Sequence, residues 1–339
     1  MNILSLHEEN WHQLQGRRER LPHALLLIGQ KGLGKFALAR EFAASLLCEQ
    51  TTPEGRACGK CQACHWFEQG HHPDFRLLQP EALAETLEVE EGKKKPSQQI
   101  TIDQVRALDE FLGVGSHRGG LNIVLVNPAE AMNRNAANAI LKILEEPPAK
   151  ILFLLVSSEP ARLLPTIRSR CQVLPIRVPN FEQATAALNA AGVQDAARWL
   201  AWTGGSARFA AEMASNSQAA WLETLTRSLL SGNQIDALAL AGDLDKQIKA
   251  GKGALTLKHL IEALQKWLVD LNLVKNGLPI RYFLLQEAKI GTLAAMIPSV
   301  RLIRLYRAMN QHRQEAEQPL NARLFLEGVF LDYRSLFSR

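Results

Sequence analysis

Residues 29–36, GQKGLGKF, have the glycine and lysine spacing of a loop that binds phosphate. In such a loop the backbone N–H groups and the following helix N-terminus surround the phosphates, and the lysine reaches the β- and γ-phosphates. The next position normally carries Ser or Thr, whose hydroxyl binds Mg²⁺, but this chain has Phe36 there. The candidate nucleotide-binding residues are Gly29, Gly32, Gly34 and Lys35.

A working loop of this kind also needs acidic residues after the next core strand, to hold the metal ion and position the attacking water. After the apolar run 121–126 the chain continues with Asn127 and Pro128, and an Asp-Glu pair is absent. Glu130 follows three residues late, and we interpret it as a surface carboxylate. Because two catalytic positions are lost together, the sequence predicts no ATP hydrolysis by this chain and leaves open whether ATP or ADP binds.

Four of the five cysteines form the pattern C-x9-C-x2-C-x2-C. Structural Zn²⁺ has four tetrahedral ligands, and a C-x2-C turn brings two thiolates to one metal ion. A site with four cysteine ligands has no open position for catalysis. The sequence therefore predicts a structural Zn²⁺ site, and the alternative is a set of reduced, buried thiols. The predicted ligands are Cys48, Cys58, Cys61 and Cys64.

Arg170 stands in the triplet Ser-Arg-Cys, after a third apolar run and a short helical stretch. An arginine at the rim of the core could enter the nucleotide site of another subunit, where a guanidinium stabilises charge on the γ-phosphate in the transition state. The alternative is an ordinary surface arginine in an ion pair. Cys171 lies apart from the other cysteines and is expected to be a small buried hydrophobe.

The elements that must position these residues alternate along the first half of the chain. Apolar runs at 24–28, 121–126 and 151–156 are typical of buried parallel strands. Apolar residues recur with helical spacing over 36–48 and 132–146. The order strand, glycine loop, helix is the context that a phosphate loop requires. The sequence therefore predicts an α/β core with a parallel sheet.

The pattern becomes entirely helical after Pro179, with short helices first and longer ones from about residue 217. We expect three domains: a P-loop-type core at 1–178 with a cysteine insert at 48–75, a small helical domain at 179–216, and an all-helical domain at 217–339.

The composition restricts the class of protein. The chain has 339 residues, 47% of them hydrophobic and 22% charged, which is typical of a soluble globular protein. No apolar run approaches the ~20 residues that span a bilayer, and the N-terminus has no secretory signal pattern, so we expect a cytoplasmic protein without a membrane partner. The net charge of +5 permits contact with nucleic acid without requiring it. The polar stretch 80–99, which includes Lys93, Lys94 and Lys95, is predicted to be a flexible surface loop.

Taken in order, these motifs resemble the clamp-loader subunits of bacterial DNA polymerase III, an AAA+ family. The most specific stretch is residues 137–171, ANAILKILEEPPAKILFLLVSSEPARLLPTIRSRC. The resemblance is strong over about residues 1–215 and only general beyond. Within the family the chain is most similar to the delta-prime members, because the ATPase members keep Lys-Thr in the loop and Asp-Glu after the second strand, where this chain has Phe36 and Asn127-Pro128.

The resemblance implies an AAA+ core with a zinc module, a helical lid, and a collar domain that assembles a hetero-pentamer with the ATPase subunits (gamma/tau) and the delta subunit. It implies that Arg170 is an arginine finger for the ATP site of the neighbouring ATPase subunit. Ser158 lies where a sensor-one residue belongs, and Arg208 where a second sensor arginine belongs.

The function implied is that of a non-hydrolysing subunit of a DNA-directed DNA polymerase holoenzyme, a nucleotidyltransferase complex. It would scaffold the loader and help place the sliding clamp on primed DNA, in the cytoplasm at the replisome. Two alternatives stay open. An ATP-hydrolysing gamma/tau-like subunit would need Mg²⁺ held by other groups, and a stand-alone zinc-containing DNA-binding protein would bind DNA by itself in a salt-sensitive way.

Overall fold

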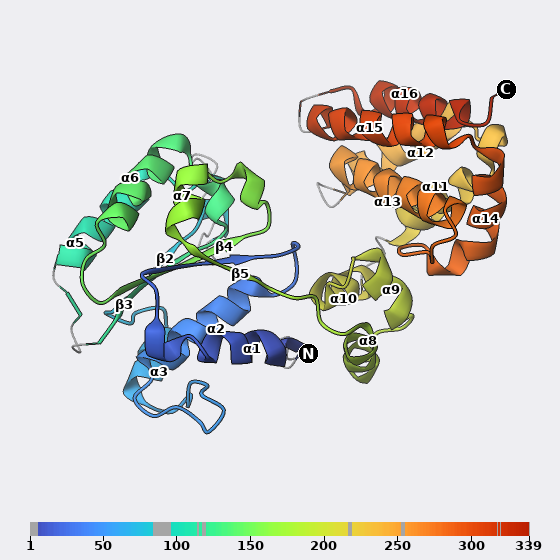
Figure 1. The fold of residues 1–339 in the computed structure, drawn as a ribbon. Helices are drawn as coiled ribbons and strands as arrows, with labels where there is room; N and C mark the ends of the chain where they lie inside the picture. Colours follow the sequence, from blue (N-terminus) through green and yellow to red (C-terminus); the bar gives the residue numbers. More distant parts are fainter. Residues whose placement is uncertain are drawn as a thin grey trace. The chain divides into compact units, whose positions relative to one another are not determined.

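The structure is a computed structural model that describes residues 6–83, 96–113, 115–116, 120–215, 219–251, 255–316, 318 and 320–338. It divides into two compact units, Met1–Asn180 and Phe181–Arg339 (Figure 1). The division into three domains expected from the sequence stays a prediction. Most of the polar stretch 80–99, including Lys93–Lys95, lies outside the described residues.

The first unit is built on a five-stranded parallel sheet with the order β2-β3-β4-β1-β5. The strands are β1 (Ala24–Ile28), β2 (Phe75–Leu78), β3 (Asn122–Val126), β4 (Ile151–Ser157) and β5 (Gln172–Pro175). Every residue of β3 and β4 is buried, which explains their unbroken apolar runs. The edge strand β2 was not predicted, because it is short and exposes Arg76.

Helices cover both faces of this sheet, as Figure 1 shows. One apolar cluster joins the sheet to α1, α2 and α3, and a second joins it to α4, α5, α6 and α7. The helices are α1 (Glu8–Gln15), α2 (Lys35–Leu47), α3 (Gln62–Glu68), α4 (Ile102–Arg106), α5 (Leu108–Gly113), α6 (Arg134–Glu145) and α7 (Pro165–Arg170). Short 3-10 turns are η2 (Arg18–Arg20), η3 (Glu81–Leu83), η4 (Ala129–Ala131) and η5 (Pro160–Arg162).

Helix α6 illustrates how local sequence sets these elements. The Asn133 side chain accepts a hydrogen bond from the Ala136 N–H at 2.8 Å and caps the helix start. Ile140 and Leu144 are buried, as their helical spacing predicts. The helix ends just before Pro147, which lacks an N–H and disfavours helix at the preceding residue.

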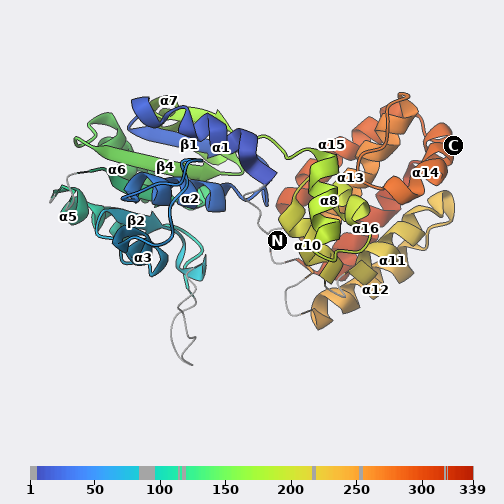
Figure 2. The same cartoon turned by 90° about the horizontal axis from the view of Figure 1, so that it is seen from below.

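The second unit contains helices and no strand among its described residues. They are α8 (Phe181–Ala190), α9 (Ala196–Trp202), α10 (Ala207–Ser215), α11 (Ala219–Leu229), α12 (Ala237–Ala250), α13 (Leu257–Lys275), α14 (Glu287–Met296), α15 (Ser299–Glu315) and α16 (Ala322–Ser335), with 3-10 turns η6 (Gly232–Gln234) and η7 (Leu284–Gln286). Helices α8, α9 and α10 pack together, α12 packs on α16, and α13 packs on α14 and α15 (Figure 2). The predicted fold class, a parallel α/β core followed by helices, is confirmed. Within the described parts of the chain, every helix is too short or too polar to cross a bilayer.

A buried carboxylate organises one segment of the second unit. Asp270 on α13 is 0% exposed, and it accepts hydrogen bonds from the backbone N–H groups of Arg281, Tyr282 and Phe283 at 2.8 to 3.0 Å. Burial raises the pKa of Asp270, and the three N–H groups oppose that shift by favouring the charged form. The carboxylate thus fixes the chain just before η7.

We expect Asp270→Ala to lower the free energy of unfolding by about 3 kcal/mol, because three backbone donors, of which that of Phe283 is buried, lose their acceptor. Urea unfolding of the purified chain measures this. The matched control is Asp243→Ala on α12, whose exposed carboxylate pairs with Lys246 at 3.4 Å and should change stability by less than about 0.5 kcal/mol. Similar losses for the two variants would contradict the role of Asp270.

Candidate functional site

The glycine loop joins β1 to α2 at the carboxyl end of the parallel sheet. Gly32 and Gly34 have φ values of 84° and 80°, a left-handed conformation that glycine adopts without strain. A Cβ atom on Gly29 would lie 3.1 Å from the carbonyl oxygen of Ile176, so this position is also tightly packed. The predicted order of strand, loop and helix is confirmed.

Lys35 is held by the chain's own acceptors. Its Nζ donates to the carbonyl oxygens of Gly29 and Gln30 at 2.8 and 2.6 Å, and to Oγ of Ser158 at 3.0 Å. The residue is 4% exposed, and burial lowers its pKa to about 8, although the nearby charge of Glu130 acts in the opposite direction. The structure therefore brings together Lys35 and Ser158, and a phosphate entering the loop would have to compete with these acceptors.

Glu130 is not a surface carboxylate, and that interpretation of the sequence is wrong. Its Oε1 accepts a hydrogen bond from the Ser158 N–H at 3.0 Å. Its Oε2 is buried without a hydrogen-bond partner among the described residues. The 3-10 turn η4 carries Glu130 toward the end of β4, so it lies near Lys35 and supplies a negative charge there. The sequence did not indicate this contact, because Glu130 lies three residues after the position where an acidic residue is expected.

The four clustered cysteines are brought together as predicted. All four Sγ atoms lie within 4.8 Å of one another. Cys48 directly follows α2, Cys58 precedes a turn at Gly59, and Cys61 and Cys64 lie at and within the first turn of α3.

The spacing of the sulfur atoms fits one tetrahedral metal ion. With metal–sulfur bonds of about 2.3 Å, the sulfurs of a tetrahedral Zn²⁺ site lie about 3.8 Å apart. The Sγ atoms of Cys48 and Cys61 are 3.9 Å apart, those of Cys58 and Cys64 are 3.9 Å apart, and those of Cys48 and Cys64 are 3.6 Å apart. The backbone N–H groups of Lys60 and Cys61 point at Cys58 and lower its pKa to about 6, which favours the thiolate that a metal requires.

The cysteine segment is attached to the core through α1. The Trp11 indole donates to the Glu54 carbonyl at 2.9 Å, and the Gln15 amide donates to the Gly55 carbonyl at 3.1 Å. The Arg56 guanidinium lies 4.7 Å from the centre of the Trp11 ring, a cation–π contact. The loop between Cys48 and Cys58 is therefore fixed at both the sulfur cluster and the core.

Arg170 lies in the last turn of α7, and its side chain is 35% exposed. One terminal nitrogen lies 2.5 Å from a Glu145 carboxylate oxygen, and the other donates to the Thr166 carbonyl at 3.1 Å. Cys171 is buried as predicted, and burial raises the pKa of its thiol to about 11. Arg208 lies in the second unit on α10, where it pairs with Glu212 at 3.0 Å, and its sensor role stays a prediction.

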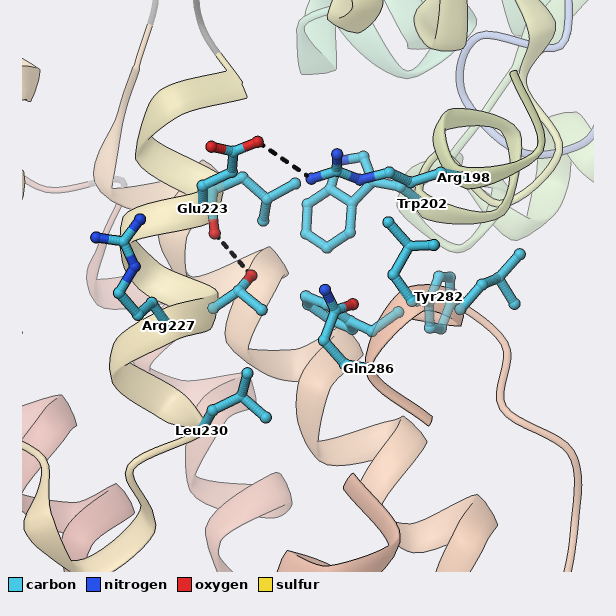
Figure 3. Close-up of a pocket in the computed structure, with 12 residues that line it drawn as sticks. Arg198, Trp202, Glu223, Arg227, Leu230, Tyr282 and Gln286 are labelled. Carbon is cyan, nitrogen blue, oxygen red and sulfur yellow. Dashed lines mark hydrogen bonds and ion pairs between the residues drawn. The ribbon is translucent and has the colours of Figure 1, made fainter. Parts of the chain in front are cut away.

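Sequence reasoning did not find a cavity of about 360 Å³ in the second unit, because its walls come from α9, α11 and the segment around η7. Trp202 and Tyr282 contribute aromatic walls to it (Figure 3). Figure 3 shows Arg198 reaching from α9 toward Glu223 on α11, and these charged groups lie 3.6 Å apart. No sequence motif marks these residues.

A parallel sheet in this strand order, with a glycine loop after β1 and a helix behind it, defines the first unit as a P-loop core of the AAA+ kind. Residues 7–180 match the model of the protein family described as "DNA polymerase III, delta subunit". This match covers just over half of the chain, and the chain belongs to that family.

Individual relatives agree with this assignment. The chain is 45% identical over 200 residues to DNA polymerase III subunit delta' of Pseudomonas aeruginosa, which covers 58% of this chain and 56% of the relative. It is 39% identical over 163 residues to subunit delta' of Escherichia coli K12, covering 48% and 44% of the two chains. It is 33% identical over 164 residues to subunit tau of Salmonella typhimurium, covering 48% and 23%. The match thus spans about half the length of the delta' relatives.

Proposed function

We propose that this chain is the non-hydrolysing, delta-prime-type subunit of a DNA polymerase III clamp loader. It scaffolds the loader and helps place the sliding clamp on primed DNA during replication, in the cytoplasm at the replisome. The family match and the names of the relatives support this function. The observation that carries the non-hydrolysing role is a phosphate loop that lacks its metal-binding hydroxyl and whose lysine is bound by its own chain.

The changes at the glycine loop argue against the gamma/tau-like alternative. Phe36 packs against the apolar cluster that joins the sheet to α1, α2 and α3, and its side chain has no oxygen to bind Mg²⁺. Asn127 and Pro128 stand where an acidic pair would hold the metal ion and position water. Glu130 is close, but its Oε1 is bound to the Ser158 backbone. Nucleotide binding at Gly29, Gly32, Gly34 and Lys35, with Ser158 and Arg208 as sensors, would then serve structure and not turnover.

The metal at the four cysteines is proposed to be a structural Zn²⁺. Four thiolates at tetrahedral spacing are the ligand set that zinc prefers, and the Sγ distances support it. The ion would tie the end of α2 to α3. It has no open coordination position, so it contributes to folding and not to chemistry.

Residues 217–339 are proposed to form the collar, and residues 179–216 the lid. Large apolar side chains are exposed on two collar helices: Val300 and Ile303 on α15, and Leu324 and Leu331 on α16. The members of each pair are three or seven residues apart and therefore share one side of their helix. Exposed apolar residues of this kind support an interface with other subunits, which we assign to the ATPase (gamma/tau) and delta subunits of a hetero-pentamer.

Arg170 is proposed to act as an arginine finger in the ATP site of the neighbouring ATPase subunit. Its position at the end of α7 and its partial exposure support delivery to another chain. A guanidinium placed there neutralises charge on the γ-phosphate as it is transferred. ATP turnover is then a property of the neighbour's site, completed by this chain.

The proposal is tested by ATP turnover and by reconstitution. We expect the purified chain to show no Mg²⁺-dependent turnover by itself. Mixed with ATPase and delta subunits it should enter one complex, and clamp loading on primed DNA should fail when the chain is omitted. Mg²⁺-dependent turnover by the isolated chain would favour the gamma/tau-like alternative. Salt-sensitive DNA binding by the isolated chain, without entry into the complex, would favour the DNA-binding alternative.

A further inference from the structure

The guanidinium of Arg170 is fixed between two helices. One terminal nitrogen lies 2.5 Å from Oε1 of Glu145, at the end of α6. The other donates to the carbonyl oxygen of Thr166, one turn earlier on α7, at 3.1 Å. Helices α6 and α7 pack against each other, so both contacts belong to one rigid part of the first unit.

The place of Glu145 follows from how α6 is built. Leu144 is buried in the apolar cluster and fixes the last turn against the sheet. Glu145 is the next residue, so it emerges at the rim of the core, beside the end of α7. Glu146 is also exposed, but it forms no ion pair in the part of the chain that the structure describes, which makes it a matched control.

Ordering of this kind matters for an arginine that acts on another chain. Arginine has much rotamer freedom, and a free side chain loses it on entering a site, which weakens the interaction that it can make there. A side chain that its own protein already holds loses less. Catalytic groups therefore depend on neighbouring residues that lock their direction.

The two contacts leave the guanidinium able to bind a phosphate. A guanidinium has five N–H donors. Glu145 and the Thr166 carbonyl each engage one terminal nitrogen, and Nε–H and further terminal N–H groups remain for an anion outside the chain. The side chain of Arg170 is 35% exposed, so these donors can be reached from solvent or from a neighbouring subunit.

We propose that Glu145 is a positioning residue for Arg170. Its carboxylate sets the direction in which the guanidinium leaves α7 and thereby controls how well this chain stabilises phosphoryl transfer in the neighbouring subunit. The inference rests on the proposed function, since it requires Arg170 to act on a neighbour's ATP.

The test uses single-turnover ATP hydrolysis by the reconstituted loader. Four variants of this chain are compared with the natural one: Arg170→Ala, Glu145→Gln, the double variant with both substitutions, and Glu146→Gln. The kinetic phase that Arg170→Ala removes is assigned to the neighbour's site. We expect Glu145→Gln to slow this phase roughly tenfold, because a misdirected group loses transition-state contacts, and to leave the ATP concentration at half-maximal rate within about twofold. Glu146→Gln should leave the phase unchanged, and Glu145→Gln should have no further effect once Arg170 is alanine.

A second measurement uses the isolated chain. Relaxation of the Arg170 Nε–H group by NMR should show faster internal motion in Glu145→Gln than in Glu146→Gln, while both variants unfold at the same temperature as the natural chain. Equal motion in the two variants would overturn the positioning role.

The outcomes separate the two proposals. If Arg170→Ala removes no phase, the arginine-finger part of the proposed function fails, whatever Glu145 does. If Arg170→Ala removes a phase that Glu145→Gln leaves at its natural rate, the positioning role fails and the finger stands. A faster phase in Glu145→Gln would also overturn the inference, because it would mean that Glu145 competes with the phosphate for the guanidinium.

Discussion

If Arg170 is the proposed arginine finger, we expect Arg170→Ala to slow ATP hydrolysis about 10³-fold at the neighbouring ATP site of the reconstituted loader, the lower end of the range for such residues. The physical reason is the loss of a positive charge where negative charge spreads over the γ-phosphoryl oxygens in the transition state. Binding of ATP to the same site should change little, because the finger acts mainly in the transition state. The remaining sites, completed by other subunits, should keep their rates.

Rapid-quench measurement of a single turnover distinguishes these sites, since the fast phase should lose the amplitude of one site. Arg168→Ala is the matched control: it removes an exposed arginine from the same helix that forms no ion pair among the residues described. A full fast phase with Arg170→Ala, or an equal loss with Arg168→Ala, would remove the finger from the mechanism.

We expect removal of the Zn²⁺ proposed for the cysteine cluster to release the segment between α2 and α3. Structural zinc sites contribute apparent binding free energies of about 10–16 kcal/mol in small zinc peptides, so we expect the free energy of unfolding to fall by at least about 3 kcal/mol. Without the metal, the turn at Gly59 keeps the hydrogen bonds that the N–H groups of Lys60 and Cys61 donate to Cys58, and these are much weaker than bonds to a metal ion. The sheet itself should survive, because its two apolar clusters contain none of the four cysteines.

Limited trypsin digestion reports this release directly, since Arg56 and Lys60 lie within the segment. A strong chelator, or Cys61→Ser, should expose these two sites to cleavage and reduce zinc content from one ion per chain. Cys171→Ser is the control, because Cys171 lies apart from the cluster, and it should keep its zinc. Unchanged cleavage after complete removal of zinc would show that the contacts to α1 hold the segment by themselves.

The central strands of the fold could be predicted because strands that are buried on both faces consist almost entirely of apolar residues. Strands β1, β3 and β4 are covered on both faces and are therefore almost continuously apolar. The edge strand β2 has only four residues, of which the middle two are not buried, and it gave no such signal.

The functional sites also differ in how far their sequence predicts them, because some are formed by residues close together in the chain and others by distant ones. The cysteine cluster is local in sequence, so its spacing was enough to predict that the sulfurs meet. The environment of Glu130 depends on Ser158, which lies 28 residues later in the sequence and comes next to Glu130 only in the folded structure. Its role could not be read from position alone. The cavity beside Trp202 is made by segments about 80 residues apart and has no sequence signature.

The hydrogen bonds of Lys35 change how a common experiment on such loops should be interpreted. Substituting the loop lysine is the usual way to ask whether a protein depends on ATP. In this chain Lys35→Ala would leave the carbonyl oxygens of Gly29 and Gln30 and the Ser158 hydroxyl without their shared donor. Under the proposed function, a weakened loader would then reflect a distorted loop and not a loss of ATP hydrolysis. Lys35 stabilises the loop by hydrogen bonds within the chain, so the effect of its substitution on the loader is not by itself evidence that this chain hydrolyses ATP.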